Sequence, residues 1–277
     1  RPSRASFPGP VVHHAFICRR RWMSKRIGDE SGESVHKKQP YEYYCVLDFE
    51  ATCEEPNPEG YEHEIIEFPV VLLNASDLKV KDTIQIFVKP RDKPHLSDFC
   101  TRLTGISQQQ VDAGISLTAA LHKIHGFLAS HGLVEGKYED HCLKPGQYHS
   151  DTGSWQYKFA FLTDGPWDLW RFLNPECQRK HIRKAGYYDM WVNVRYLFCE
   201  YHEIHRANIA SMLQHYKLEF QGAPHSGLDD SKNIARIAVH LARDGCSLRM
   251  NDGVHVGGKR HGRRRKSSRS KRGRVRG

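Results

Sequence analysis

The sequence predicts an α/β fold in which a mixed sheet is flanked by helices. Three β-like segments follow one another in the first third of the 277-residue chain, which indicates an antiparallel meander. Further along, helical and strand-like segments alternate, which is typical of a sheet with helices packed on its faces. The chain shows no internal repeat, and we expect these segments to form one domain.

The strands are predicted from short, apolar, β-rich runs. YYCVLDFEA (43–51) begins apolar and indicates a buried strand. EIIEFPVVLLN (64–74) and DTIQIFVKP (82–90) follow, separated by a turn-like link. KFAFLTDG (158–165) predicts a fourth strand that ends in a turn, and MWVNVRYLF (190–198) predicts a short strand that runs into a helix.

The helices are predicted from their apolar spacing and their terminal residues. Ser97 is the expected N-cap of the first, and Pro166 stands at a first-turn position where proline is tolerated. Gly245 is expected to end the last one. The second helix presents one apolar face, made of Leu117, Leu121, Ile124 and Leu128. The expected helical stretches are 96–107, 116–130, 166–174, 207–220 and 229–245.

Residues 135–158 are polar and rich in Gly, His and Tyr, and they predict a long surface loop. The loop contains HCLKPGQYH (141–149), whose one Cys and two His raise the question of a metal site. We interpret these side chains as solvated.

The charge is concentrated at the two ends. Residues 1–40 carry a net charge of +6 and residues 251–277 carry +10, whereas 41–250 carry −6. We expect a disordered basic N-terminal arm over 1–40, a folded domain over 41–252 and a disordered basic C-terminal tail over 253–277. Basic arms on an acidic body favour a polyanionic partner.

The compartment is predicted only coarsely. None of the eight cysteines forms a CxxC pair, which favours reduced thiols in an intracellular protein. No apolar run is as long as the roughly 18 residues that a membrane helix needs, so we expect no membrane partner. The basic tail is equally suited to be a nuclear or nucleolar address and an RNA-holding arm, so nucleus, nucleolus and cytoplasm stay open.

Two carboxylates, Asp48 and Glu50, leave the first strand together. Residues two apart on a strand point to the same face. Like charges at this spacing repel one another, and near a buried core they also lose hydration. Because a divalent cation removes both costs, the pair indicates a metal site. Two solvated acids at a strand edge are the alternative.

A third carboxylate is expected where the fourth strand ends. Asp164 and Asp168 both lie at this end, the usual place for sites in open α/β sheets. Asp164 is also suited to cap the following helix. We favour Asp168 as the ligand, because Trp167 and Trp170 beside it could form walls for a base or ribose.

The segment PHSGLDDSKNIAR (224–236) supplies the last two groups. Pro224 and Gly227 predict a loop around His225, and the helix is expected to begin at Asp229 or Asp230. A carboxylate on a rigid helix suits a metal ligand, whereas a histidine on a loop suits a mobile general base. Hard carboxylate oxygens favour Mg²⁺ or Mn²⁺ over Zn²⁺. Two such ions about 4 Å apart can hold the attacking and leaving oxygens of a phosphodiester in line.

Together these groups follow the order D-x-E, D, H-x4-D, which resembles the DEDDh 3′–5′ exonucleases. The resemblance extends to the Eri-type exoribonucleases, the 3′ histone-mRNA exonuclease family, and covers about residues 41–252. The motifs that carry it are EIIEFPVVLLN, LSDFCTRLTGISQQQVD, TDGPWD, HSGLDDSKNIARIAV and DGCSLRMN.

The resemblance implies an RNase H-like fold and a 3′–5′ exoribonuclease that releases nucleoside 5′-monophosphates from a 3′-hydroxyl end. It implies two Mg²⁺ ions, replaceable by Mn²⁺, with His225 as general base and Glu50 among the catalytic groups. The implied metal ligands are Asp48, Glu50, Asp168 and Asp230. Phe49 and Ala51 would line the terminal nucleotide, the LTGI turn would hold its base and Trp167 would flank it. The implied substrate contacts are Phe49, Ala51, Leu103, Thr104, Gly105, Ile106, Trp167 and His225.

The chain also departs from this family. Members that bind histone-mRNA stem-loops carry an N-terminal SAP domain, for which residues 1–40 are too short and too irregular. The expected partner is therefore stated broadly as structured RNA, from rRNA precursors, histone mRNA or the small RNAs of RNA interference, with the ribosome as a further candidate. A DNA or oligonucleotide exonuclease and a non-catalytic RNA-binding adaptor are the alternatives. The sequence says nothing about the oligomeric state.

Overall fold

The structure, a computed structural model, describes residues 37–144 and 155–254. The arms predicted over 1–40 and 253–277 lie almost wholly outside the described residues. The few arm residues that are described belong to the folded domain. Gln39 is buried, its side-chain amide donates to the carbonyl of Cys246 (3.1 Å) and its oxygen accepts from the backbone of Leu248 (2.9 Å).

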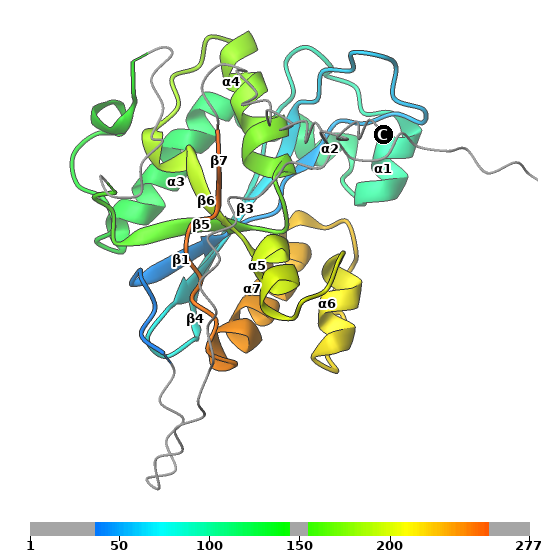
Figure 1. Cartoon of the computed structure of the whole chain (residues 1–277). Helices are drawn as coiled ribbons and strands as arrows, with labels where there is room; N and C mark the ends of the chain where they lie inside the picture. The colour runs from blue at the N-terminus through cyan, green and yellow to red at the C-terminus, as the bar shows by residue number, and fades with distance from the viewer. Residues whose placement is uncertain (1–36, 145–154, 255–277) are drawn as a thin grey trace, which may run out of the picture. The chain divides into compact units, whose positions relative to one another are not determined.

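Among the described residues, seven strands form one mixed sheet (Figure 1). The predicted meander is confirmed, because β3 pairs antiparallel with both β1 and β4. The central strands β1, β5 and β6 run parallel, and β7 closes the far edge antiparallel to β6. The strands are β1 (Tyr43–Val46), β2 (Glu50–Ala51), β3 (Ile65–Asn74), β4 (Val80–Phe87), β5 (Phe159–Thr163), β6 (Met190–Asn193) and β7 (Asp252–Gly253).

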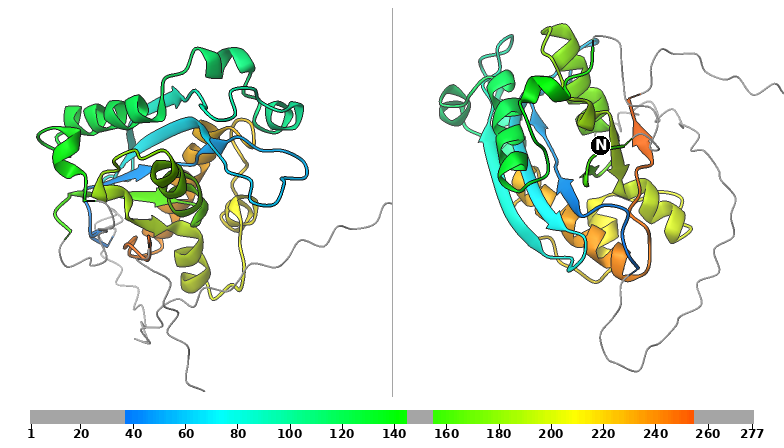
Figure 2. Two further views of the ribbon diagram at one scale, coloured as in Figure 1. Left: turned by 90° about the horizontal axis from the view of Figure 1, so that it is seen from above. Right: turned by 90° about the vertical axis from the view of Figure 1, so that its left-hand side faces the viewer.

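Helices cover both faces of the sheet, as predicted (Figures 1 and 2). One face carries α3 (Leu117–Ser130) together with η3 (Trp167–Leu173), a π-helical segment, and α4 (Asn174–Arg179). The other face carries α5 (Val194–Tyr201), α6 (Ile209–His215) and α7 (Gly227–Arg243). The remaining helical segments of the described residues are α1 (Asp98–Thr104), α2 (Gln108–Asp112) and two 3-10 turns, η1 (Tyr138–His141) and η4 (Gly186–Tyr188).

The two-residue period of the strands divides the core between these faces. On β1, Cys45 packs with the helices of the α3 face, whereas Tyr44 and Val46 pack with those of the α7 face. The central strands are buried on both sides, and their sequences are therefore continuous apolar runs. Burial of this surface is the main contribution that stabilises the sheet and its two helical layers.

Several local predictions are confirmed. Ser97 is the N-cap of α1, and its hydroxyl accepts from the backbone of Cys100 at 3.0 Å. Gly245, with φ of 97°, follows the end of α7 in a left-handed conformation that glycine adopts without strain. The four apolar residues predicted to share one face of α3 are all buried in the core.

Two predictions needed correction. The strand expected over 43–51 is broken between β1 and β2, because the chain leaves its pairing with β5 and continues along β3 alone. The prediction that 135–158 is a surface loop holds for most of its described residues, which are exposed, but not for Tyr138 and Tyr157, which are buried. The ring of Tyr157 packs 5.4 Å from that of Tyr187, so aromatic area ties this segment to the core.

The metal motif considered within that segment is only partly described. Both ring nitrogens of His141 form hydrogen bonds within the protein. One lies 3.0 Å from the hydroxyl of Tyr157 and the other lies 2.7 Å from the carbonyl oxygen of Glu135. His149 lies outside the described residues. None of the described helices is both long and apolar enough to cross a membrane.

Candidate active site

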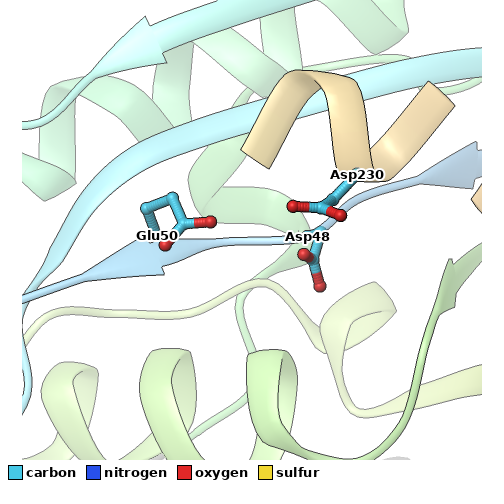
Figure 3. Close-up of side chains that lie close together, drawn as sticks. All are labelled: Asp48, Glu50 and Asp230. Atoms are coloured by element: carbon cyan, nitrogen blue, oxygen red, sulfur yellow. The ribbon is translucent and has the colours of Figure 1, made fainter. Parts of the chain in front are cut away.

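Three carboxylates meet where β1 ends and α7 begins. Asp48 lies in the segment that links β1 to β2, Glu50 is the first residue of β2, and Asp230 comes from the first turn of α7 (Figure 3). One oxygen from each lies within 4.8 Å of the others. The structure therefore brings together three of the four carboxylates predicted as metal ligands, from opposite ends of the domain sequence.

Asp168 lies beside this group but is oriented differently. It is buried in the first turn of η3, and one of its oxygens accepts a hydrogen bond from the backbone N–H of Phe49 at 2.8 Å. That bond fixes the carboxylate against the segment between Asp48 and Glu50. π-Helical turns are frequent at functional sites, and here the turn places the fourth acid at the carboxyl end of β5.

Asp164, the alternative to Asp168, has another partner. Both of its oxygens accept from the guanidinium of Arg195, at 3.1 and 2.6 Å. This bidentate pair occupies the carboxylate, and the N-cap position of η3 is taken by Pro166. Asp164 thus neither caps the helix nor points a free carboxylate at the other acids.

His225 lies on the exposed turn that precedes α7. Its backbone is in the left-handed region, with φ of 62°, and its N–H donates to the carboxylate of Asp230. The turn is therefore tied to a metal-ligand candidate through the main chain while the imidazole stays open to solvent. This arrangement agrees with the mobile base expected from the loop.

Burial and the neighbouring acids make the ionised form of each of the four carboxyl groups less favourable. Burial, followed by repulsion from Asp168, raises the pKa of Asp48 well above its ordinary value. Burial and the neighbouring Glu67 raise the pKa of Glu50 to about 9. Burial raises the pKa of Asp168 to about 7, against the opposing hydrogen bond from Phe49, and that of Asp230 to about 6.

This environment fits a divalent cation. The converging donors are all carboxylate oxygens, the ligand type of Mg²⁺ and Mn²⁺, and Zn²⁺ sites instead favour Cys and His. A bound cation would supply the positive charge that the buried acids lack.

The metal-free protein is expected to lose stability as the pH rises from about 6 to about 9. Carboxyl groups of the unfolded chain titrate near 4, so the raised pKa values of Asp230, Asp168 and Glu50 mean that the folded state holds protons more tightly. Their stabilisation is present at low pH and is lost as the pH passes the folded-state values.

Thermal melts in EDTA between pH 6 and 9 check this expectation. Mg²⁺ should restore more of the melting temperature at the alkaline end, where it no longer competes with protons. The Glu50→Gln variant lacks a group whose pKa in the folded protein is about 9 and should show a shallower decline above about pH 7.5. A melting temperature in EDTA that climbs across this range contradicts the prediction.

The residues expected to contact substrate lie around the acids. Ala51 is on β2, and the sulfur of Cys100 on α1 lies 3.7 Å from its carbonyl oxygen. Phe49 has its ring buried edge-on against Phe68, with 4.6 Å between the ring centroids. Trp167 is 52% exposed on η3.

The LTGI turn closes α1 beside Ala51. Thr104 ends the helix and its hydroxyl accepts from the backbone of Ile106 at 3.1 Å, while Gly105 takes a φ of 70°. Ile106 is buried with Cys100, whereas Leu103 is partly exposed. The turn is therefore rigid and lies next to the strand that carries Glu50.

Two residues of this region were not identified from the sequence, and a third, Gly227, was assigned to the loop before the helix, whereas it is the first residue of α7. Arg195 neutralises Asp164 from α5, and Glu67 bonds to the start of α7 from β3. Gly227 allows the backbone of α7 to approach that of Asp48. Only Glu67 left a signal in the sequence, as a charged residue inside an otherwise apolar strand.

Comparisons with known proteins agree with this geometry. Residues 45–142 and 154–238 match a family model described as Exonuclease, RNase_T. The chain is 42% identical over 219 residues to 3′-5′ exoribonuclease 1 of Rattus norvegicus, covering 78% of this chain and 58% of that protein. The chain thus spans somewhat less than three fifths of that relative's length.

Two solved structures are similar at 40% identity, each with a TM-score of 0.69. One is the nuclease domain of 3′hExo, a DEDDh family member, bound to rAMP, and the match covers 79% of this chain and 100% of that chain. The other is described as 3′-end specific recognition of histone mRNA stem-loop by 3′-exonuclease, and covers 82% of this chain and 71% of that chain.

Proposed function

This chain belongs to the Exonuclease family of the matching model, in its DEDDh branch, and from that membership we propose that it is a 3′–5′ exoribonuclease. The observation that carries the proposal is the convergence of Asp48, Glu50 and Asp230, with Asp168 beside them. A buried group of acids beside a polyanionic substrate is unfavourable unless cations complete it. The same acids therefore argue against a purely RNA-binding adaptor.

The residues divide the work of hydrolysis between them. Asp48, Glu50, Asp168 and Asp230 would hold two Mg²⁺ ions, with Mn²⁺ as a substitute. When bound, these ions neutralise the phosphate and activate a water for in-line attack. His225 accepts the proton of that water, and its exposed turn lets the imidazole approach and leave. The released product would be a nucleoside 5′-monophosphate.

The terminal nucleotide would lie between Ala51, the LTGI turn and Trp167. The rigid turn on α1 supplies a fixed wall, and the exposed indole supplies a face on which a base can stack. Arg171 lies over the ring of Trp167, 5.4 Å from its centroid, and restrains it.

A 3′-end degradation assay tests the proposal. A 5′-labelled RNA with a short single-stranded 3′ end beyond a stem is compared with its DNA counterpart, in Mg²⁺ and in EDTA. The proposal expects a metal-dependent ladder of shortened RNA and mononucleotide 5′-phosphates. An equal ladder on DNA favours the general exonuclease, and salt-sensitive binding without any ladder favours the adaptor.

The physiological substrate is proposed as a structured RNA 3′ end. A similar solved structure concerns a histone mRNA stem-loop, which makes that RNA the first candidate beside rRNA precursors and small RNAs. Charge supports an RNA partner, since the two basic ends of the chain flank an acidic middle. From the same basic ends, we propose that the protein resides in the nucleus, the nucleolus or the cytoplasm.

Trp167→Ala is expected to raise KM for RNA about 10-fold with a smaller change in kcat. Stacking of a base on an aromatic ring contributes about 1–3 kcal/mol, and removing it weakens substrate binding more than chemistry. Because Trp167 is half exposed, the fold should be unaffected. Steady-state kinetics check this, with Tyr196→Ala, another exposed aromatic, as the control. An unchanged KM excludes Trp167 from the nucleotide site.

A further inference from the structure

Glu67 is a buried carboxylate in the middle of an apolar strand. It lies on β3 opposite Glu50 on one side and Phe87 on the other, and is 1% exposed. A buried charge is unfavourable unless its oxygens are bonded. Two of the hydrogen-bond donors to the carboxylate of Glu67 come from α7.

Both oxygens of Glu67 accept hydrogen bonds from the start of α7. The backbone N–H of Gly227 bonds to Oε2 at 3.0 Å and that of Leu228 bonds to Oε1 at 3.0 Å. Ser226, which precedes the helix, makes no side-chain capping bond among the described residues. The side-chain amide of Gln85 on β4 donates to Oε1 at 2.8 Å and orients the carboxylate. Glu67 therefore caps α7 from the sheet, where its negative charge also interacts favourably with the helix dipole.

The capped end of α7 lies very close to the strand that carries the acids. A Cβ atom at Gly227 would lie 2.5 Å from the carbonyl oxygen of Asp48 and 3.2 Å from the carboxylate of Glu67. No side chain fits there unless the helix moves away. Gly227 and Glu67 thus set the separation between α7 and the backbone of Asp48.

That separation decides whether the metal site is complete. Asp230 stands one turn beyond Gly227, and Figure 3 shows α7 above the strand segment of Asp48 and Glu50, with the carboxylate of Asp230 directed at both. His225 stands two residues before Gly227, so the same bonds hold the turn of the general base. A shift of α7 by a fraction of an ångström would change the oxygen geometry that Mg²⁺ requires.

We propose that Glu67 is a positioning residue of the metal site, which docks α7 so that Asp230 completes the ligand set of Asp48 and Glu50. The proposal rests on the proposed function, in which these carboxylates bind divalent cations. Glu67 is not one of the three converging carboxylates. Its oxygens accept from the side chain of Gln85 and from two backbone N–H groups of α7, and the effect of the latter bonds reaches the site through the helix.

Glu67→Gln tests this role with little change in volume. The amide oxygen can accept from only one of the two helix N–H groups, and the NH₂ group faces the other. We expect the dissociation constant for Mn²⁺, measured by calorimetry without RNA, to rise about 10-fold or more, as is typical when a group that orients a ligand is lost. In RNA cleavage at saturating metal, kcat should fall while KM changes by less than about 2-fold.

Glu64→Gln is the matched control. Glu64 is an equally buried carboxylate three residues upstream, and it accepts from the backbone of Arg91, Asp92 and Lys93 and pairs with Lys180. Its loss should lower the melting temperature, but its bonds do not reach α7. We therefore expect its Mn²⁺ affinity to remain within about 2-fold of wild type.

The Gly227→Ala variant separates the effect of the position of α7 from the effect of the charge of Glu67. It keeps the carboxylate of Glu67 but forces α7 away from Asp48, so it should weaken Mn²⁺ binding as Glu67→Gln does. Hydrogen exchange of the amides of Gly227 and Leu228, faster in the metal-free Glu67→Gln protein, reports the lost cap directly and needs no activity.

Two results overturn the positioning role. One is a folded Glu67→Gln protein with wild-type Mn²⁺ affinity, and the other is weakened binding in Glu67→Gln but not in Gly227→Ala, which assigns the effect to charge alone. A wild-type protein that binds Mn²⁺ and leaves RNA intact refutes the proposed function but not the positioning role.

Discussion

Asp48→Asn is expected to reduce 3′–5′ degradation about 10³-fold, equivalent to about 4 kcal/mol of transition-state stabilisation. Asn has the shape of Asp but no charge, and the charge of Asp48 is opposed by its neighbours. Burial and the charges of Asp168, Asp230 and Glu50 all raise its pKa. Its carboxylate therefore adds repulsion to the metal-free fold and a ligand to the metal-bound one.

In the metal-free protein, Asp48→Asn should therefore keep or raise the melting temperature although it lowers activity. In EDTA near pH 8 we expect Asp48→Asn to melt at the same temperature as wild type or above it, because one buried charge is gone. In Mg²⁺ the gain in melting temperature seen for wild type should largely disappear. Asp112→Asn, an exposed aspartate on α2, should change neither quantity. Rapid degradation by a folded Asp48→Asn protein would remove Asp48 from the metal site.

His225→Asn is expected to lower the rate about 10²- to 10³-fold, the usual contribution of a positioned general base. Asn is preferred to Ala here, because it tolerates the left-handed φ of 62° and preserves the turn. The carboxylates are untouched, so Mn²⁺ affinity should stay within about 2-fold of wild type. Loss of rate with intact metal binding distinguishes the base from the ligands.

The pH profile gives the second measurement for His225. The imidazole accepts a proton only when neutral, so at saturating metal the wild-type rate should rise with pH. The variant should lack that rise. His205→Ala, an exposed histidine elsewhere, should keep both rate and profile. A variant of His225 with the wild-type profile would assign the base to another group.

The acids expected to bind metal could be predicted because charged residues are unusual in the segments that carry them. Asp48 and Glu50 interrupt an apolar strand with a two-residue spacing, and Asp230 lies in the first turn of an amphipathic helix behind a glycine. The meander and the order of helices follow from equally local patterns. These features depend on neighbours within a few residues, which a sequence displays directly.

The remaining features depend on residues far apart in the chain. Asp164 and Asp168 look alike in sequence, and what separates them is Arg195, which pairs with Asp164 from α5. Likewise, Tyr138 and Tyr157 stand among polar residues and were assigned to the surface, whereas Tyr157 packs against the ring of Tyr187 and the hydroxyl of Tyr138 donates to the carbonyl of Arg183. Side-chain partners of this kind are set by tertiary packing.

Under the proposed function, we expect the docking of α7 against β1 also to set when the site is completed during synthesis. Asp48 and Glu50 emerge early, whereas Asp230 belongs to the last helix of the domain. A nascent chain that still lacks α7 holds three of the four proposed ligands and lacks Asp230, and the turn of His225 is not yet docked. Under the proposed function, we expect the enzyme to be inert while it is attached to the ribosome and its own messenger, and to become competent when its final helix packs onto the sheet.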